Sequence, residues 1–121
     1  DRVLRRALGS GRILFVLGCL GDLPAVLARR TRALRRAAPR AGGAYVLYGM
    51  SGNLRCRENH ALCAAITLAN ASGLPVLVAF ELTETYPYAS DRHHRFLLEG
   101  ARATLNGLRG LGIAAHAFVH R

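Results

Sequence analysis

Short apolar runs alternate with longer amphipathic stretches through the last two thirds of the chain. Residues typical of strands fill Ala44–Tyr48, and a continuous apolar run occupies Val76–Phe80. A strand that is apolar at every position is expected inside a parallel sheet covered on both faces. Helical patterns follow at Arg57–Ser72 and from Ser90 to Gly110 or Gly112, and Ile113–Val119 predicts a third strand.

The ends of the two predicted helices carry recognisable signals. Gly73 suits the left-handed position after the first helix, and Pro75 prevents its continuation. Ser90 is a suitable N-cap for the second helix, with Asp91 at its positive end. The faces expected to be buried are Leu62, Ile66 and Ala69 in the first helix and Leu97, Ala101, Leu105 and Leu108 in the second.

The predicted order β-α-β-α-β indicates an α/β fold, a Rossmann-like parallel sheet whose strands neighbour one another in sequence order. Three strands leave both sheet edges unpaired. The chain also begins with Asp1 rather than methionine. We therefore expect part of a larger α/β domain, incomplete at its C-terminal end.

The first third of the chain differs in composition. Residues 1–44 hold ten arginines and two acidic residues, a net charge of +8, whereas residues 45–121 hold seven and five, a net charge of +2. We predict an arginine-rich extension and linker at residues 1–43 and the α/β domain at residues 44–121. Within the extension, a helix is expected at Leu23–Ala38, with Asp22 as its N-cap.

Composition excludes several classes of protein. The apolar fraction of 51% is too high for a charge-dominated disordered chain. The longest apolar run, Ile13–Leu20, is far shorter than a membrane span and is expected to be a short buried strand or helical turn rather than a secretory signal. Three cysteines are too few for a disulfide scaffold. The expected setting is cytoplasmic, with no membrane partner.

Candidate chemistry is sparse. The loop after the first strand has two glycines but matches neither the dinucleotide fingerprint nor the phosphate-binding loop. His93 and His94 are adjacent on a helix, so their side chains diverge by about 100° and are not expected to bind one metal ion. Cys56 and Cys63 are expected to pack in the interior. We therefore predict no metal site and no catalytic residue.

Several short motifs nevertheless occur in a specific order. Together they resemble the N-terminal α/β domain of DNA photolyases and cryptochromes, especially the class II type, over about residues 40–121. The motifs are Tyr45–Tyr48 with Met50, Arg55 before Glu58–Leu62, Leu74–Val76 with Val78, Phe80 and Leu82, Ala89 to Gly100, and Leu111–Ile113. Gly49 departs from the tryptophan common in that family, and Ser51 departs from a common glutamine.

The resemblance implies light-driven repair of cyclobutane pyrimidine dimers by the full-length protein. Its FAD-binding helical domain is absent from these 121 residues, and damaged DNA would be a partner of the full-length protein alone. The α/β part would hold an antenna pigment, a deazaflavin or methenyltetrahydrofolate. Because ligands of open α/β sheets bind beyond the carboxyl ends of the strands, the predicted pigment pocket consists of Met50, Ser51, Gly52, Asn53, Arg55, Phe80, Glu81 and Leu82.

Three other functions remain open at this stage. A cryptochrome-like photoreceptor would share the fold without repairing DNA. A stand-alone nucleotide-binding module of the universal-stress type would bind ATP. An arginine-rich adaptor would bind nucleic acid through residues 1–44, with affinity that falls steeply as salt is added.

Overall fold

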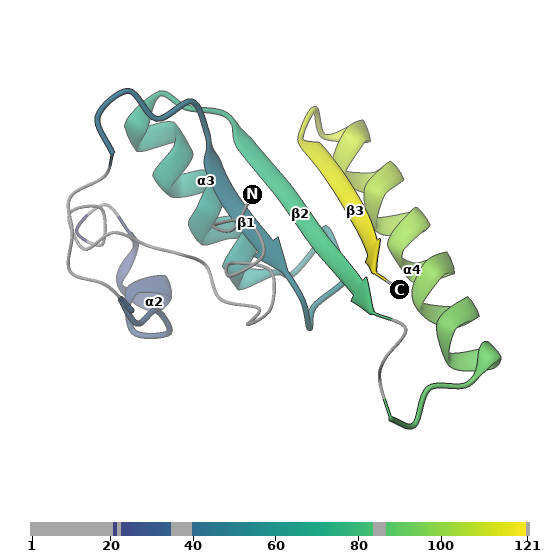
Figure 1. Ribbon diagram of the computed structural model, residues 1–121. Helices are drawn as coiled ribbons and strands as arrows, with labels where there is room; N and C mark the ends of the chain where they lie inside the picture. Colours follow the sequence, from purple (N-terminus) through teal and green to yellow (C-terminus); the bar gives the residue numbers. More distant parts are fainter. Residues whose placement is uncertain (1–20, 22, 35–39, 84–86, 121) are drawn as a thin grey trace.

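The structure, a computed structural model, describes residues 21, 23–34, 40–83 and 87–120 (Figure 1). Its elements, in chain order, are α2 (Ala25–Ala28), β1 (Val46–Met50), α3 (His60–Ser72), β2 (Val76–Thr83), α4 (Asp91–Gly110) and β3 (Ala114–His120).

The three strands form one parallel sheet in the order β1-β2-β3. Tyr48 of β1 lies opposite Val78 of β2, which in turn lies opposite Ala115 of β3. The α/β class, the β-α-β-α-β order and the sequential arrangement of the strands are thereby confirmed.

Both long helices pack on the same face of the sheet. Side chains at even positions of β1 and β2, among them Met50 and Phe80, lie in one cluster with residues of α3 and α4 such as Leu62 and Leu108. Figure 1 shows α3 running behind β1 and β2, with α4 alongside β3. The alternate positions, such as Leu47 and Leu77, face the other side of the sheet.

Two strands extend further toward their carboxyl ends than the sequence indicated. The expected end of β1 at Tyr48 is wrong, because Gly49 and Met50 pair with Ala79 and Phe80. β2 continues to Thr83 rather than ending at Phe80. The reason is tertiary: Glu81, Leu82 and Thr83 pair with Phe118, Val119 and His120 of β3, so the backbone groups of this polar-flanked segment are satisfied by a neighbouring strand.

The helix ends are only partly as expected. Gly73 adopts the left-handed conformation (φ 64°), and Ser90 accepts a hydrogen bond from the backbone N–H of His93, so both caps are confirmed. α4 ends at Gly110. α3, however, begins at His60 and not at Arg57, because the side chain of Asn59 caps it by accepting a hydrogen bond from the backbone N–H of Leu62.

The long helix expected at 23–38 is wrong. The structure shows the four-residue α2, whose N-cap position is Pro24, followed by turns, while Asp22 and residues 35–39 lie outside the described residues. The hydroxyl of Thr31 bonds the carbonyl oxygen of Leu27 (2.8 Å), a contact that competes with helix continuation. Leu23 and Leu27 give α2 its anchor, because they pack on Ala64 and Leu68 of α3.

The remaining expectations concern an apolar run near the N-terminus, two cysteines and membrane spans. The run Ile13–Leu20 is outside the described residues. The expected burial of Cys63 is wrong, since that side chain is exposed on α3, and Cys56 is half-buried. Among the described helices, none is both long and apolar enough to cross a bilayer.

Candidate functional site

The carboxyl end of the sheet divides into two neighbouring regions. The first is the β1–α3 turn, residues 51–59, which connects the end of β1 to the start of α3. The second is the α4 pocket, a cleft between the ends of β2 and β3 and the first turns of α4. Its lining residues are Leu82, Thr83, His94, Leu97, Leu98 and Val119.

Asn59 organises the β1–α3 turn from beneath. Its side chain is 1% exposed, and its Nδ2 group donates to the carbonyl oxygens of Asn53 (3.2 Å) and Arg55 (3.0 Å). The same Nδ2 group donates to the Tyr48 hydroxyl at 3.1 Å, so its two amide protons are shared among three acceptors. The Tyr48 hydroxyl also lies 3.3 Å from the Asn59 Oδ1 atom, which accepts the capping bond from Leu62. One carboxamide thus joins the end of β1, the turn and the start of α3.

α4 holds the same turn from the other side. The Oγ1 atom of Thr104, in a side chain that is 4% exposed, donates to the carbonyl oxygen of Leu54 at 3.0 Å. One turn further along α4, Gly107 lies against Cys56, and a Cβ atom at Gly107 would come within 2.6 Å of the Cys56 Sγ atom. A side chain at position 107 would therefore displace the turn or the thiol.

The environment of Tyr48 affects its ionisation. Burial raises the pKa of the Tyr48 hydroxyl above its ordinary value of 10.0, and the hydrogen bond with Asn59 offsets part of that rise. Tyr48 is consequently neutral at physiological pH, and its hydroxyl is hydrogen-bonded to Asn59 within the core.

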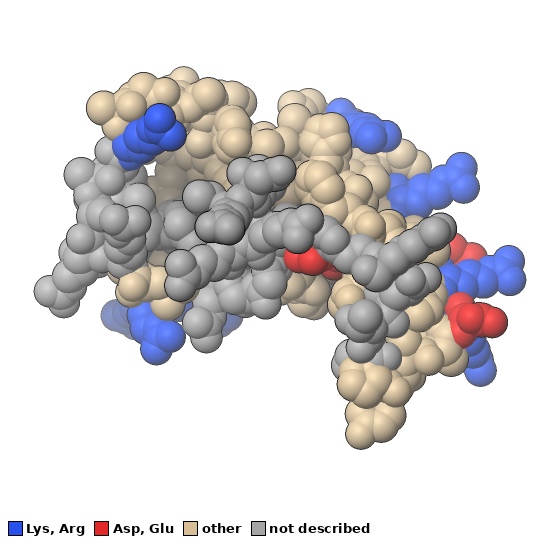
Figure 2. Space-filling view, viewed as in Figure 1, with Lys and Arg blue, Asp and Glu red and all other residues tan. Residues whose placement is uncertain are grey.

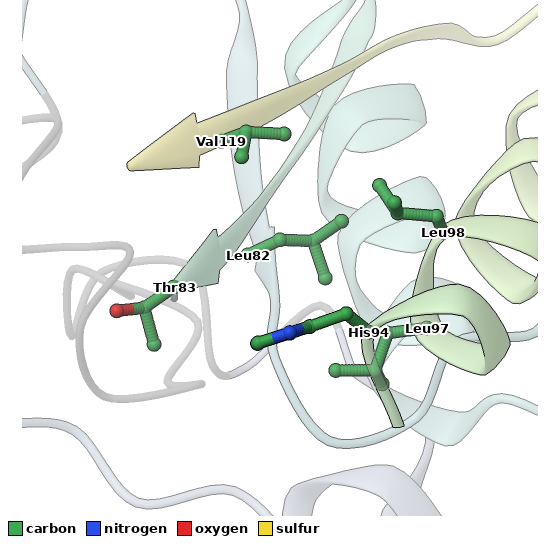
Figure 3. Close-up of a pocket in the computed structure, with 6 residues that line it drawn as sticks. All are labelled: Leu82, Thr83, His94, Leu97, Leu98 and Val119. Carbon is green, nitrogen blue, oxygen red and sulfur yellow. The ribbon is translucent and has the colours of Figure 1, made fainter. Parts of the chain in front are cut away.

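The α4 pocket is mainly apolar. Figure 3 shows the His94 ring extending from α4 toward Leu82 of β2, with Val119 of β3 and Leu98 on the opposite side. Its volume is about 130 Å³. Cofactor sites commonly occupy roughly 300–1,000 Å³, so this pocket has room for one ring and not for a complete tricyclic pigment.

His94 supplies the polar atom of greatest interest in that pocket. Its Nε2 atom is buried and makes no hydrogen bond within the described part of the chain. The neighbouring His93 ring meets it edge to face at a centroid distance of 6.1 Å. An unpaired buried nitrogen destabilises a folded protein by about 1–3 kcal/mol. The α4 pocket therefore contains a destabilising polar atom, whereas the buried polar side chains of the β1–α3 turn are hydrogen-bonded.

The predicted pigment residues fall into two groups. The expectation that Met50, Glu81 and Leu82 lie in loops is wrong, because all three are in strands. Phe80 lies in β2 as expected, and the side chains of Met50 (1%) and Phe80 (0%) are buried beneath the helices. Leu82 lines the α4 pocket, and Glu81 is half-buried on β2. Ser51, Gly52 and Arg55 are exposed in the β1–α3 turn, with Asn53 half-buried beside them.

Sequence reasoning did not identify three residues that organise these regions. Asn59 directly precedes α3, where an N-cap is expected, so its capping role had a readable signal. Its bonds to the turn, the bond from Thr104 and the burial of the His94 nitrogen depend on contacts between distant elements. No pattern in the sequence marks them.

The described surface charges are mixed and exposed. Arginine and acidic side chains lie together along α4, on the right of the view in Figure 2, and Arg95 forms an exposed ion pair with Glu99 (3.3 Å). Such a pair contributes little to stability. Within the described residues there is no cluster of three His, Cys, Asp or Glu side chains suited to hold a metal ion.

Comparison with known proteins identifies a relative of this chain. It is 44% identical over 86 residues to the deoxyribodipyrimidine photo-lyase of Methanothermobacter thermautotrophicus. The match covers 71% of this chain but 19% of that protein, so the chain spans a small part of its relative's length. No family model and no solved structure matches. Over the matched 86 residues, the chain is similar to that photo-lyase.

Proposed function

We propose that this chain is the α/β antenna part of a deoxyribodipyrimidine photolyase of the class II type. The observation that carries the proposal is the 44% identity over 86 residues to a protein of that name. The full-length protein would use FAD and light to repair cyclobutane pyrimidine dimers in DNA. Residues 44–121 would hold a second pigment, and residues 1–43 would be an extension to that domain.

The pigment would lie over the carboxyl end of the sheet, where ligands of open α/β folds bind. We assign direct contacts to Ser51, Gly52, Asn53 and Arg55 of the turn and to Leu82 of the α4 pocket. Met50 and Phe80 would support this surface from the core, since their side chains are fully buried.

The residues present fit an aromatic pigment that carries an anionic group. The α4 pocket accepts the edge of one ring among leucine side chains. Arg55 is exposed and forms no ion pair within the described residues; a guanidinium binds a carboxylate or an aromatic oxyanion through paired N–H donors. When bound, a deazaflavin or a folate supplies light absorption and transfer of excitation energy to FAD.

The test is a titration of the 121-residue chain with 8-hydroxy-5-deazaflavin and, separately, with methenyltetrahydrofolate, followed by the absorbance and fluorescence of the pigment. We expect one of the two to bind. Arg55→Ala should weaken that binding at least about tenfold, because it removes a charge-assisted hydrogen bond. Leu82→Ala should weaken it less.

Arg57→Ala is the matched control, since Arg57 is an equally exposed arginine two residues further along the same turn. It should leave the affinity unchanged. Failure of the chain to bind either pigment, or binding that is insensitive to both Arg55→Ala and Leu82→Ala, would contradict the proposal. Repair by the full-length protein separates a photolyase from a cryptochrome-like photoreceptor.

A further inference from the structure

The two buried polar side chains of the described core both serve one short turn. Asn59 and Thr104 are the polar residues that are almost fully buried, at 1% and 4% exposure. Asn59 donates to the carbonyl oxygens of Asn53 and Arg55, and Thr104 donates to that of Leu54 between them. Three consecutive backbone carbonyl groups therefore accept hydrogen bonds from buried side chains.

This turn is held far more tightly than a connection requires. The Arg55 N–H donates to the Asn53 carbonyl oxygen at 2.8 Å, which closes a three-residue turn. Thr104 is 50 residues away in the sequence, so its bond ties the turn to α4, while Asn59 ties it to α3 and β1. In an exposed connection between a strand and a helix, water can pair the carbonyl groups, and buried side-chain donors are not needed.

The backbone of the β1–α3 turn is strained at Glu58. Glu58 has φ 50°, the only positive value in a non-glycine residue among the described positions. A left-handed conformation costs such a residue roughly 1–2 kcal/mol. Strain of this kind persists where the surrounding contacts fix the backbone, and it concentrates at functional positions.

Of the three residues whose carbonyl groups are held in this way, Arg55 is the one with an exposed side chain. Its backbone is bonded at both ends, through its N–H to Asn53 and through its carbonyl to Asn59, while its guanidinium stands in solvent at the carboxyl end of the sheet. Fixing the backbone of an arginine lowers the entropy that it loses when it binds an anionic oxygen.

We propose that Asn59 and Thr104 are positioning residues that hold Arg55 ready to bind an anionic group of the pigment. The assignment of the pigment rests on the proposed function above. The positioning itself is a property of this chain without a ligand, so it is testable separately.

The first measurement is hydrogen exchange of the free 121-residue chain. Thr104→Val removes the hydroxyl that reaches Leu54 and keeps the shape of the side chain. We expect the Arg55 amide to exchange at least about fivefold faster in this variant, while amides in the middle of α3 keep their rates. Thr67→Val is the matched control, because the Thr67 hydroxyl bonds only within α3, to the Cys63 carbonyl oxygen (2.9 Å).

The second measurement is a double-mutant cycle on pigment affinity with the deazaflavin or folate probe that binds. Thr104→Val should weaken binding about fivefold when Arg55 is present and have no effect when Arg55 is already alanine. Asn59→Ser, which keeps a capping oxygen for α3, loses the amide protons and adds no charge, should behave in the same way. A residue that only stabilises the fold would weaken binding equally in both backgrounds.

The outcomes are distinguishable. An Arg55 amide that exchanges equally fast in the wild type and in Thr104→Val overturns the positioning role. Equal effects of Thr104→Val with and without Arg55 overturn its link to binding. A wild-type chain that binds neither pigment overturns the proposed function and the role of Arg55 in it, whereas the exchange result still decides whether Thr104 holds the turn.

Discussion

The β1–α3 turn and the α4 pocket lie at the same edge of the sheet but differ in how their buried polar groups are paired. In the turn, every carbonyl group from Asn53 to Arg55 is paired with a buried donor. In the pocket, leucine side chains surround an imidazole nitrogen that has no partner among the described residues. The turn is therefore expected to be rigid and intolerant of polar changes, and the pocket to be adaptable.

Removal of Asn59 should have the largest effect. Asn59→Ala leaves the Arg55 carbonyl group and the Tyr48 hydroxyl without a partner, removes one of the two bonds to the Asn53 carbonyl oxygen, and also removes the cap of α3. We expect the free energy of unfolding to fall by about 3 kcal/mol, measured by urea denaturation. Asn70→Ala, at an exposed position of the same helix, should change it by less than about 0.5 kcal/mol; similar losses in the two variants would contradict the hub role of Asn59.

The second-largest loss of stability is expected at the contact between α4 and the β1–α3 turn. Gly107→Ala places a methyl group against the Cys56 Sγ atom and should cost about 1–2 kcal/mol. Gly100→Ala in the same helix has nothing within 4 Å and should stabilise the chain by up to about 1 kcal/mol. Both are read from thermal unfolding midpoints.

The double variant Gly107→Ala/Cys56→Ala checks the cause of that loss. Without the Sγ atom, the nearest Cys56 atom is the Cβ, at an ordinary 3.7 Å. We expect the double variant to be at least as stable as Cys56→Ala alone. A further loss on adding Gly107→Ala in this background would show that the crowding lies elsewhere.

Removing a buried polar group from the α4 pocket should lower the free energy of unfolding far less. His94→Leu replaces a ring with an unpaired buried nitrogen by an apolar side chain in apolar surroundings. The free energy of unfolding is expected to stay within about 1 kcal/mol of the wild type or to rise. His94→Ala, which enlarges the pocket, should cost more. If His94→Leu lost as much as Asn59→Ala, the contrast between the two regions would be wrong.

The smallest effect is confined to alkaline pH. The pKa of Tyr48 is raised in the folded chain, mainly by burial. Above pH 10 the unfolded chain therefore releases this proton first, and the free energy of unfolding falls as the pH rises toward the folded-state pKa. Tyr48→Phe should remove this part of the decline in alkaline denaturation curves, whereas Tyr88→Phe, at an 85% exposed position, should leave the curve unchanged.

Local signals predicted most of the fold. A run such as Val76–Phe80 and the caps at Gly73 and Ser90 act within a few residues, and each was found where it was expected. The helix expected at 23–38 rested on terminal signals such as Asp22 and is wrong, because this arginine-rich segment buries only Leu23 and Leu27 among its described side chains. Helix propensity without an apolar face to bury does not sustain a long helix.

The candidate site was less predictable for a related reason. The carboxyl end of the sheet follows from the order of the elements, so Ser51 to Arg55 were placed at the right edge. The burial of Met50 was not foreseen, because β1 runs further than its expected end at Tyr48. Strand ends are set by pairing with a neighbour, and that neighbour is distant in the sequence.

By itself, the sequence determined a parallel β-α-β-α-β unit and the residues that follow the carboxyl end of β1, because periodicity, caps and chain order are local properties. The tertiary structure alone decided that Asn59 and Thr104 both hold one turn and that the His94 nitrogen faces leucine side chains. Hydrogen bonds between residues up to 50 positions apart depend on how the helices pack on the sheet. That packing brings the distant donors and acceptors within reach of each other.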